Sequence, residues 1–341
     1  MAQVNIGVLG LGRMGQVYAT HVAQRIEGVR LVAVADPRFE VAESFAARFG
    51  GVRVYADFRE LLARTDIHGV IVATPTSTHQ EVVIAAAEAG KAIFCEKPTA
   101  LTLEGTDAMV DAVERRGVLF QVGFMRRFDD GCAAAKRQLD AGEIGDPVAI
   151  RSIGRDPGRT SLEFANPAVS GGLIVDMAIH DCDLVRWYMG SEVERVYTEV
   201  SCMVFPELQT VGDVDYAMIS LRLENGALGN IEVSRDAIYG YDIQTEIIGS
   251  KGTLKVGYLQ YTPVVLVTKA GVTHDIVPHF PQRFGPAYTR QIEHFADCLL
   301  NGRTPMTTTD DARAALQIAV AATRSQHEGR VVYLKELERQ A

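Results

Sequence analysis

The first 124 residues alternate short apolar runs with longer segments of helical periodicity. The apolar runs fall at residues 4–9, 31–35, 70–73, 92–95 and 119–122. Segments between them, such as "HQEVVIAAAEAG" and "LEGTDAMVDAVERRG", repeat apolar residues at helical spacing. Runs that are apolar on both faces, joined by amphipathic helices, indicate a parallel sheet covered by helices on both sides. We therefore predict a doubly wound α/β domain over residues 1–124.

The pattern changes over residues 125–341. Helical periodicity near 129–141 and 172–189 is followed by strand-like runs separated by turn signals such as "ENGA" and "GSKGT". The predicted strands span 196–204, 214–223, 227–233, 242–248, 253–256 and 264–268, and two further helices span 286–301 and 309–327. Consecutive strands with short turns favour a mostly antiparallel open sheet, so we predict an α+β domain.

Composition narrows the possible partners. The chain has 341 residues, of which 47% are hydrophobic, enough for a full globular core in two domains. Its net charge is −9 and no dense run of lysine and arginine occurs, so we expect no nucleic-acid partner. No stretch of about 18 uncharged apolar residues occurs, so we expect no association with a membrane.

The N-terminus and the cysteines indicate a cytoplasmic protein. The first residues lack a basic segment, and their apolar run is interrupted by Gly7, Gly10 and Gly12, which argues against a secretory signal. The five cysteines lie far apart and show no C-x-x-C spacing, which argues against a disulfide framework or a structural zinc site. These features fit a reducing compartment.

A glycine pattern follows the first apolar run. In "VLGLGRMGQVYATHV", Gly10, Gly12 and Gly15 stand in G-x-G-x-x-G register between a predicted strand and a predicted helix. The first glycine permits a tight turn, the second lets backbone approach a pyrophosphate, and the third lets the helix pack against the strand. The sequence therefore predicts a dinucleotide-binding Rossmann turn, which includes Arg13 and Met14.

Asp36 ends the second apolar run, 21 residues after Gly15. An acidic side chain at this place accepts hydrogen bonds from the adenosine ribose hydroxyls and repels a 2′-phosphate, so NAD is favoured over NADP. Arg38, two residues further on, is placed to soften that preference. A glycine-rich turn beside a solvated aspartate is the alternative, which the strand–helix–strand context disfavours.

A third strand end carries several hydroxyl groups. In "ATPTSTHQ", Thr74, Thr76 and His79 follow the run at 70–73. Ligands bind at the carboxyl ends of strands in doubly wound sheets, so we expect these residues to line the cofactor cleft. For Ser77 and Thr78, capping of the following helix is the better interpretation.

The run at 92–95 ends in "EKP". Glu96 and Lys97 should emerge at the same edge of the sheet, where a nicotinamide would lie, and a cis Lys97–Pro98 bond would direct Lys97 into the cleft. Glu96 either contacts the nicotinamide ribose or neutralises Lys97. A surface ion pair is the ordinary alternative for this tripeptide.

The stretch "GGLIVDMAIHDCDLVRWYMG" at 171–190 carries a second set of polar residues. If it is helical, Asp176 and His180 lie one turn apart on one face, with Asp183 a further turn along. A carboxylate one turn from an imidazole can orient the ring and stabilise its protonated form, as a general base requires. A divalent metal on these three residues is an alternative, but no additional ligand cluster supports it and we expect no metal.

These motifs together resemble a known family. A glycine turn, "EKP" after the fifth strand and a D-x-x-x-H pair in a following α+β domain are similar to the oxidoreductase family of glucose-fructose oxidoreductase, inositol dehydrogenase and the rhizopine-catabolism proteins. The resemblance covers nearly the whole chain. Three stretches resemble the inositol 2-dehydrogenases in particular: "QVGFMRRFD" (121–129), "YGYDIQTEIIG" (239–249) and "QRFGPAY" (282–288).

The resemblance implies an NAD-dependent dehydrogenase that oxidises a secondary hydroxyl of a cyclic polyol, such as myo- or scyllo-inositol. Asp176 and His180 match the family's D-x-x-x-H residue by residue. Because a hydroxyl proton must leave as hydride departs from the same carbon, His180 is expected to accept the proton and Asp176 to orient the ring. Lys97 would hold the reacting oxygen, help to relay the proton and stabilise alkoxide character.

Substrate contacts are implied for Arg127, Asp156 and Tyr239, in addition to the three catalytic residues. These positions match ones that face the substrate in the inositol enzymes. Asp156 departs from the pattern, which usually has asparagine there, so the stereoisomer stays open. The structural alternatives are an ion pair of Arg127 or its neighbouring arginine with Asp129 or Asp130, and a sheet position for Tyr239.

Three related functions compete with this reading. They are a pyranose 1- or 3-dehydrogenase, an NAD-using glycoside hydrolase of the same broad family, and a non-enzymatic dinucleotide sensor. The sensor is disfavoured because Lys97, Asp176 and His180 are all present.

The predicted sheet of the second domain leaves one face for a partner. Val200, Met218 and Ile231 are expected on exposed sheet faces and suggest a homo-oligomer, and members of the resembled family are often dimers or tetramers. We therefore expect residues 125–341 to bind a small polyol or sugar substrate and to support oligomerisation.

Overall fold

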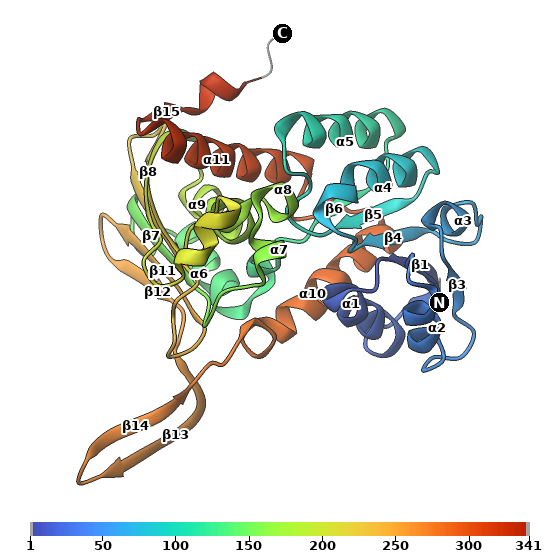
Figure 1. Ribbon diagram of the computed structural model, residues 1–341, viewed down its shortest axis with the longest axis horizontal. Helices are drawn as coiled ribbons and strands as arrows, with labels where there is room; N and C mark the ends of the chain where they lie inside the picture. The colour runs from blue at the N-terminus through green and yellow to red at the C-terminus, as the bar shows by residue number, and fades with distance from the viewer. Residues whose placement is uncertain (1–2, 339–341) are drawn as a thin grey trace. The chain divides into compact units, whose positions relative to one another are not determined.

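The structure is a computed structural model that describes residues 3–338 and separates into two compact units. The first unit contains the described residues up to Met125 together with Pro286–Arg313. The second contains Arg126–Gly285 together with the described residues from Ala314 onward (Figure 1). Two long helices, α10 (Phe280–Asn301) and α11 (Thr309–Glu328), therefore contribute residues to both units.

The first unit is built on a six-stranded parallel sheet in the order β3-β2-β1-β4-β5-β6. The strands are β1 (Val4–Leu9), β2 (Val29–Ala35), β3 (Arg53–Tyr55), β4 (Gly69–Val72), β5 (Ala92–Cys95) and β6 (Phe120–Val122). Every residue of β4 and β5 is buried, as expected for central strands covered on both faces. The predicted doubly wound fold is confirmed.

Five helices connect these strands: α1 (Arg13–Gln24), α2 (Phe39–Ala46), α3 (Phe58–Leu62), α4 (Thr76–Glu88) and α5 (Leu103–Arg116). Local sequence signals determine where several of these helices begin and end. Thr102 caps α5 by accepting a hydrogen bond from the Gly105 N–H, and Gly117 ends the helix with φ +60°, a conformation that favours glycine. The chain order of strands reverses next to β1, so β1 and β4 flank the usual ligand site of this fold.

The second unit is built on a seven-stranded mixed sheet in the order β12-β11-β7-β10-β9-β8-β15. Its strands are β7 (Pro147–Arg155), β8 (Val193–Ser201), β9 (Tyr216–Leu223), β10 (Leu228–Ser234), β11 (Asp242–Gly249), β12 (Thr253–Val256) and β15 (Val332–Tyr333). All neighbouring pairs are antiparallel except β7 and β10, which run parallel. The mostly antiparallel open sheet is therefore confirmed.

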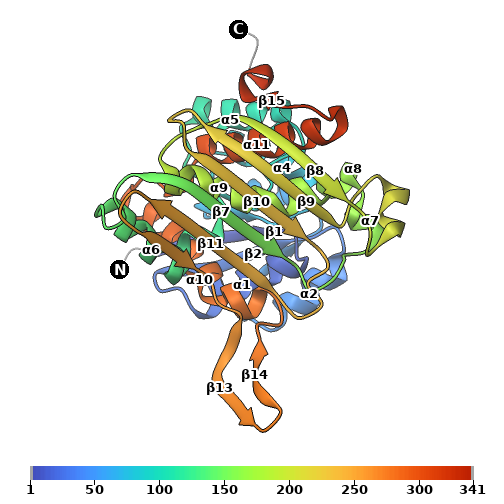
Figure 2. The same ribbon diagram turned by 90° about the vertical axis from the view of Figure 1, so that its left-hand side faces the viewer.

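Helices cover one face of this sheet. α6 (Asp130–Asp140) packs on β12, and α9 (Ile179–Met189) packs on β7 and β10. Short helices α7 (Leu162–Ala165), α8 (Pro167–Ser170) and η3 (Pro206–Val211) lie at one end. Further helical segments are η1 (Met125–Phe128), η2 (Ile174–Ala178) and η4 (Leu334–Leu337). Figure 2 shows the other sheet face toward the viewer, with none of the described helices of this unit in front of it.

Two expectations about this sheet are wrong. Ile231 is fully buried on the helical side, because alternate residues of β10 face the core, whereas Met218 on β9 is 46% exposed on the open face. The predicted strand at 264–268 does not join the sheet. It belongs to β13 (Gln260–Thr268), which pairs only with β14 (Gly271–Ile276) in a separate two-stranded ribbon.

Among residues 3–338, no helix combines the length and the apolar character needed to cross a bilayer.

Candidate active site

The three glycines of the turn between β1 and α1 differ in how much space surrounds them. Gly10 has φ +86°, and a Cβ there would lie 2.7 Å from the Ala73 carbonyl oxygen. A Cβ on Gly15 would lie 1.9 Å from the Gly10 carbonyl oxygen, so the helix could not approach the turn. A Cβ on Gly12 would meet nothing within 4 Å. The first and third glycines thus serve packing, and the second borders open space that a ligand can enter.

The N-terminus of α1 is suited to an anion. Gly12 occupies the N-cap position without a side-chain cap, and the first turn carries no acidic residue. Unpaired backbone N–H groups and the helix dipole therefore favour a negatively charged group there. Arg13 is exposed and Met14 half-buried in this turn. The residues present fit the pyrophosphate of a dinucleotide.

Asp36 connects the end of β2 to this turn. Its buried carboxylate accepts hydrogen bonds from the Leu11 N–H at 2.8 Å, the Arg38 N–H at 2.9 Å and the Arg38 Nε at 3.1 Å. Burial alone would raise the pKa of Asp36, but the hydrogen bonds from Arg38 and Leu11 outweigh it and lower the pKa. The carboxylate is therefore held ionised beside the glycine turn.

His79 holds two loops of the first unit together. Its buried ring lies with Nδ1 2.9 Å from the Pro98 carbonyl oxygen and Nε2 2.9 Å from the Thr74 carbonyl oxygen. Burial lowers the pKa of His79, against the effect of these backbone contacts. We assign His79 this structural role, whereas Thr74 and Thr76 are half-buried at the carboxyl end of β4 and stay in the predicted cofactor site.

The expected capping by Ser77 or Thr78 is wrong. The N-cap of α4 is Pro75, and no side chain caps this helix. The Thr78 hydroxyl instead donates to the Pro75 carbonyl at 2.8 Å and lies 2.9 Å from the Thr74 hydroxyl.

Glu96 is held at the end of β5. One carboxylate oxygen accepts a hydrogen bond from the Tyr18 hydroxyl, and the other accepts from the Lys97 N–H at 2.9 Å. Gln291 on α10 donates to the Tyr18 hydroxyl at 2.9 Å. Burial raises the pKa of Glu96, while Tyr18 and Lys97 oppose that shift. The Lys97–Pro98 peptide bond is cis, and Lys97 is half-buried next to this network.

These residues share one edge of the sheet. The glycine turn follows β1, Asp36 follows β2, Thr74 follows β4 and Lys97 follows β5, and these four strands are parallel neighbours. The first unit thus brings together the cofactor residues that the sequence predicts.

Asp176 and His180 lie in the second unit. Asp176 belongs to a single π-helical turn, η2 (Ile174–Ala178), which leads directly into α9, where His180 is buried. The predicted helix is therefore present but begins with a wider turn, a feature that often marks functional sites. The Asp176 side chain is 20% exposed, and its Oδ2 lies 3.5 Å from Nη2 of Arg235.

Two buried arginines form ion pairs with carboxylates of α9. Arg126 Nη1 lies 2.5 Å from the Asp181 carboxylate, and Arg127 contacts both oxygens of Asp183, at 2.9 and 2.5 Å. Asp129, one of the partners considered for these arginines, binds Arg283 at 2.7 Å. A bidentate pair fixes orientation, so Arg127 holds the helix that carries His180.

The ion pair between Arg127 and Asp183 also concerns the alternative that a divalent metal binds at this segment. The carboxylate of Asp183, the third ligand considered, is bound by Arg127. No group of three or more histidine, cysteine, aspartate or glutamate side chains within residues 3–338 is arranged to hold a metal ion.

Asp156 and Tyr239 lie in adjoining loops. Backbone hydrogen bonds join Asp156 to Ser234 at 2.9 Å and to Ala237 at 3.0 Å. Tyr239 lies in the turn between β10 and β11, so its expected alternative as a sheet residue is wrong. Its hydroxyl donates to Asp242 at 2.8 Å and accepts from Arg155 at 3.1 Å.

Arg235 and Asp213 were not identified from the sequence. Arg235 follows β10 directly and is only 2% exposed, with Nη1 3.7 Å from Oδ2 of Asp213. A charge immediately after an apolar strand was the signal that identified Lys97, and "EVSR" carries the same signal.

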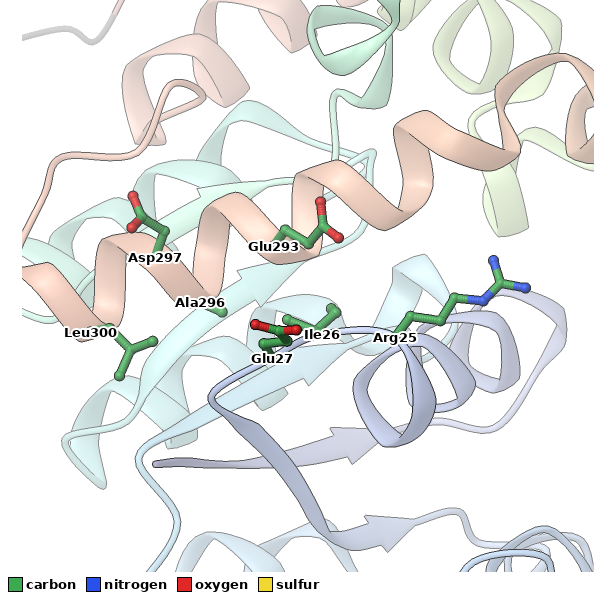
Figure 3. A pocket seen from close by; sticks show the side chains of 7 residues that line it. All are labelled: Arg25, Ile26, Glu27, Glu293, Ala296, Asp297 and Leu300. Carbon is green, nitrogen blue, oxygen red and sulfur yellow. The ribbon is translucent and has the colours of Figure 1, made fainter. Parts of the chain in front are cut away.

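One cavity of the first unit contains none of the predicted residues. It has a volume of about 430 Å³ and lies between the turn after α1 and one face of α10 (Figure 3). Its lining comprises Arg25, Ile26, Glu27, Glu293, Ala296, Asp297 and Leu300. Three carboxylates and no glycine turn make it unsuited to a dinucleotide phosphate.

The fold and these residues define a dinucleotide-binding protein with a catalytic-type Asp-His segment in its second unit. Two family models match the chain. One is described as the NAD-binding Rossmann fold of an oxidoreductase family and covers residues 4–124, and the other as the C-terminal alpha/beta domain of the oxidoreductase family and covers residues 136–334. The chain therefore belongs to this oxidoreductase family.

Individual relatives are similar along their whole length. The chain is 42% identical to scyllo-inositol 2-dehydrogenase (NAD(+)) of Bacillus subtilis, covering 97% of this chain and 96% of that protein. It is 37% identical to myo-inositol 2-dehydrogenase of Thermotoga maritima, covering 98% and 99%. The crystal structure of scyllo-inositol dehydrogenase from Lactobacillus casei with NAD(H) and scyllo-inositol matches with a TM-score of 0.93 at 31% identity, covering 98% and 99%.

Proposed function

We propose that the protein is an NAD-dependent inositol dehydrogenase that oxidises one secondary hydroxyl of myo- or scyllo-inositol to the corresponding inosose. The observation that carries this proposal is the similarity of the whole chain, from glycine turn to final helix, to enzymes named for this reaction. We assign the catalytic roles to Lys97, Asp176 and His180, which match the family's "EKP" and D-x-x-x-H motifs in the sequence.

The residues of the first unit bind the cofactor. The N-terminus of α1 at Gly12 holds the pyrophosphate, and Asp36 accepts hydrogen bonds from the adenosine ribose. The ionised state of Asp36 disfavours a 2′-phosphate, so NAD is used in preference to NADP. Bound NAD supplies the hydride acceptor.

Lys97 and two residues of the second unit act on the hydroxyl proton of the substrate. His180 accepts the hydroxyl proton as the carbon–hydrogen bond gives up its electron pair, so that alcohol and NAD⁺ become ketone, NADH and one proton. Asp176 orients the ring and stabilises the imidazolium. Lys97 donates a hydrogen bond to the reacting oxygen and stabilises the negative charge that develops on that oxygen.

Asp156 and Tyr239 are the proposed contacts to the remaining hydroxyls. Backbone hydrogen bonds join Asp156 to Ser234 and Ala237, which lie just before Tyr239 in the chain, so the two loops adjoin. Arg127 was also expected to contact substrate. Its bidentate pair with Asp183 makes support of α9 its main proposed contribution.

A substrate panel tests the proposal. Purified protein with NAD is given myo-inositol, scyllo-inositol, other inositols and glucose, and NADH is followed by absorbance. We expect NADH with at least one inositol. Turnover of glucose but no inositol would instead identify a pyranose dehydrogenase. Tightly retained cofactor with no net NADH would point to a glycoside hydrolase, and binding of NAD without any turnover to a sensor.

We also propose that the protein works as a homo-oligomer, a dimer or tetramer, in the cytoplasm. The open sheet face carries Met218 and Leu228, 46% and 53% exposed, and the β13–β14 ribbon is apolar and exposed. All five cysteines are free thiols and four are buried, which suits a reducing compartment.

A further inference from the structure

Arg235 lies between two carboxylates in the interior of the second unit. Its side chain is 2% exposed, with Nη2 3.5 Å from Asp176 and Nη1 3.7 Å from Asp213. A buried guanidinium is costly unless anions compensate it, so both carboxylates help to hold Arg235 in the interior. One cation is thus shared between two anions.

This arrangement differs from the other buried ion pairs of the unit. Arg127 grips Asp183 through two hydrogen bonds of 2.9 and 2.5 Å. Neither Nη atom of Arg235 makes a hydrogen bond within the described part of the chain. A pair at 3.5 Å without a hydrogen bond acts mainly through charge, because Coulomb attraction falls slowly with distance whereas hydrogen bonding does not.

Asp213 fixes the start of the same π turn. Its Oδ1 accepts a hydrogen bond from the Leu173 N–H at 2.8 Å, directly before η2. A Cβ at Gly172, where φ is +71°, would lie 2.8 Å from this oxygen. Asp213 therefore anchors the backbone that carries Asp176, and Arg235 links the two carboxylates.

We propose that Arg235 is a positioning residue for the dehydrogenase reaction: it holds the Asp176 carboxylate in place, and so maintains the group that orients His180. This inference rests on the proposed function. Charged groups near Asp176 include Arg235 after β10, Asp213 after η3, and His180 on its own helical segment.

Removal of the guanidinium would leave two carboxylates facing each other. Burial already raises the pKa of Asp213, an effect that the Leu173 N–H and Arg235 oppose and that the charge of Asp176 reinforces. Without Arg235, the pKa of Asp213 would rise further, because the cation that opposes the effect of burial would be gone. The two carboxylates would also repel each other, and Asp176 would lose the cation that holds it in place, so kcat would fall.

The test compares kcat at pH 7 for four variants. Arg235→Met should lower kcat at least about tenfold, with the NAD dissociation constant unchanged. Arg235→Lys keeps the charge and should retain most of kcat. Arg235→Met combined with Asp213→Asn removes the repelling carboxylate and should restore much of kcat. Arg283→Met removes another buried arginine and should leave kcat nearly unchanged.

A stability cycle provides a readout that does not need turnover. The urea midpoint is measured for Arg235→Met in the parent and in the Asp176→Asn background. If Arg235 acts on Asp176, its replacement should shift the midpoint at most half as far in the second background. Equal shifts in both backgrounds would overturn the inference.

The two proposals fail in different ways. If the parent protein oxidises no polyol or sugar, the proposed function is wrong, and the stability cycle still decides the role of Arg235. If the parent is active but Arg235→Met keeps its kcat, the inference about Arg235 is wrong. A double variant no better than Arg235→Met alone would also overturn it.

Discussion

At the residue scale, Gly12 and Gly15 stand three residues apart in one turn and tolerate a methyl group very differently. A Cβ on Gly15 would overlap the Gly10 carbonyl oxygen at 1.9 Å, and a backbone atom cannot move aside cheaply. Gly15→Ala should therefore lose about 3 kcal/mol of stability or more. Gly12→Ala should fold normally but bind NAD at least about tenfold more weakly, because its methyl group occupies the path of the pyrophosphate.

Thermal unfolding and calorimetric titration with NAD separate these two effects. The steric interpretation requires the stability loss in one variant and the affinity loss in the other. Wild-type NAD affinity in Gly12→Ala would show that the open space beside this glycine is not where the cofactor binds.

Lys97 provides the second prediction at this scale. Lys97→Ala should lower turnover at least about a hundredfold, since it removes a group that acts on the proton and the developing charge. NAD affinity should stay nearly unchanged, because the glycine turn and Asp36 provide the main contacts to the cofactor. Steady-state kinetics and NAD titration measure both. Near-normal turnover in this variant would refute the catalytic role of Lys97.

The sequence predicts residues whose environment is set locally. Lys97 follows four buried residues of β5 and Asp36 follows β2, so their positions at the sheet edge follow from strand direction alone. The partner of Arg127 could not be predicted, because Asp183 is 56 residues away and the pairing depends on how α9 packs. The sequence did not reveal that Arg235 is buried. β10 alternates buried and less buried residues, and a charged residue after such a strand is normally expected to face solvent.

At the scale of elements, four strands escaped prediction, β3, β7, β14 and β15, and the first two did so for different reasons. β3 has only three residues, none of them fully buried, so it leaves little periodicity to detect. β7 contains Arg151 and Gly154 within its run, and it pairs in parallel with β10 across a long stretch of chain. Such non-local pairing leaves no turn signal. The π-helical turn at Asp176 could not be predicted either, because its sequence is compatible with an ordinary α-helix.

Helix α1 carries a histidine that should make stability depend on pH. Burial first and then Arg25 lower the pKa of His21 from 6.5 to about 4, with Thr289 on α10 3.3 Å from its ring. The folded state therefore binds this proton less readily than the unfolded state. The contribution of His21 to stability is complete above pH 6.5 and is lost as the pH falls toward 4.

His21→Gln should consequently flatten this dependence. Between pH 7 and pH 5, the melting temperature of the variant should fall less than that of the parent protein. His327 is exposed near the end of α11, and His327→Gln serves as the control, whose melting curve should follow the parent. Parallel slopes for the His21 variant and the parent would contradict the prediction.

At the scale of the whole molecule, the β13–β14 ribbon is the feature that a single chain leaves unexplained. A two-stranded ribbon is marginally stable in water, and this one pairs with no further strand of the described chain. It extends beyond the seven-stranded sheet of its unit (Figure 2). Its exposed apolar side chains are Val264, Val265, Leu266, Val267 and Val272, between 46% and 72% exposed. Exposed apolar groups on both faces are expected of an interaction surface, and in the proposed homo-oligomer a second copy would cover it.

Val264→Lys combined with Leu266→Lys should therefore reduce the size of the assembly. These two side chains share one face of β13, and burying each one is worth about 1.5–3 kcal/mol that two lysines would forfeit. Sedimentation velocity measures the assembly. Gln24→Lys with Ser44→Lys adds the same charge at exposed positions of α1 and α2 and should leave it unchanged. A parent protein that sediments as a monomer, or a ribbon variant that assembles like the parent, would show that the ribbon is not a contact between copies.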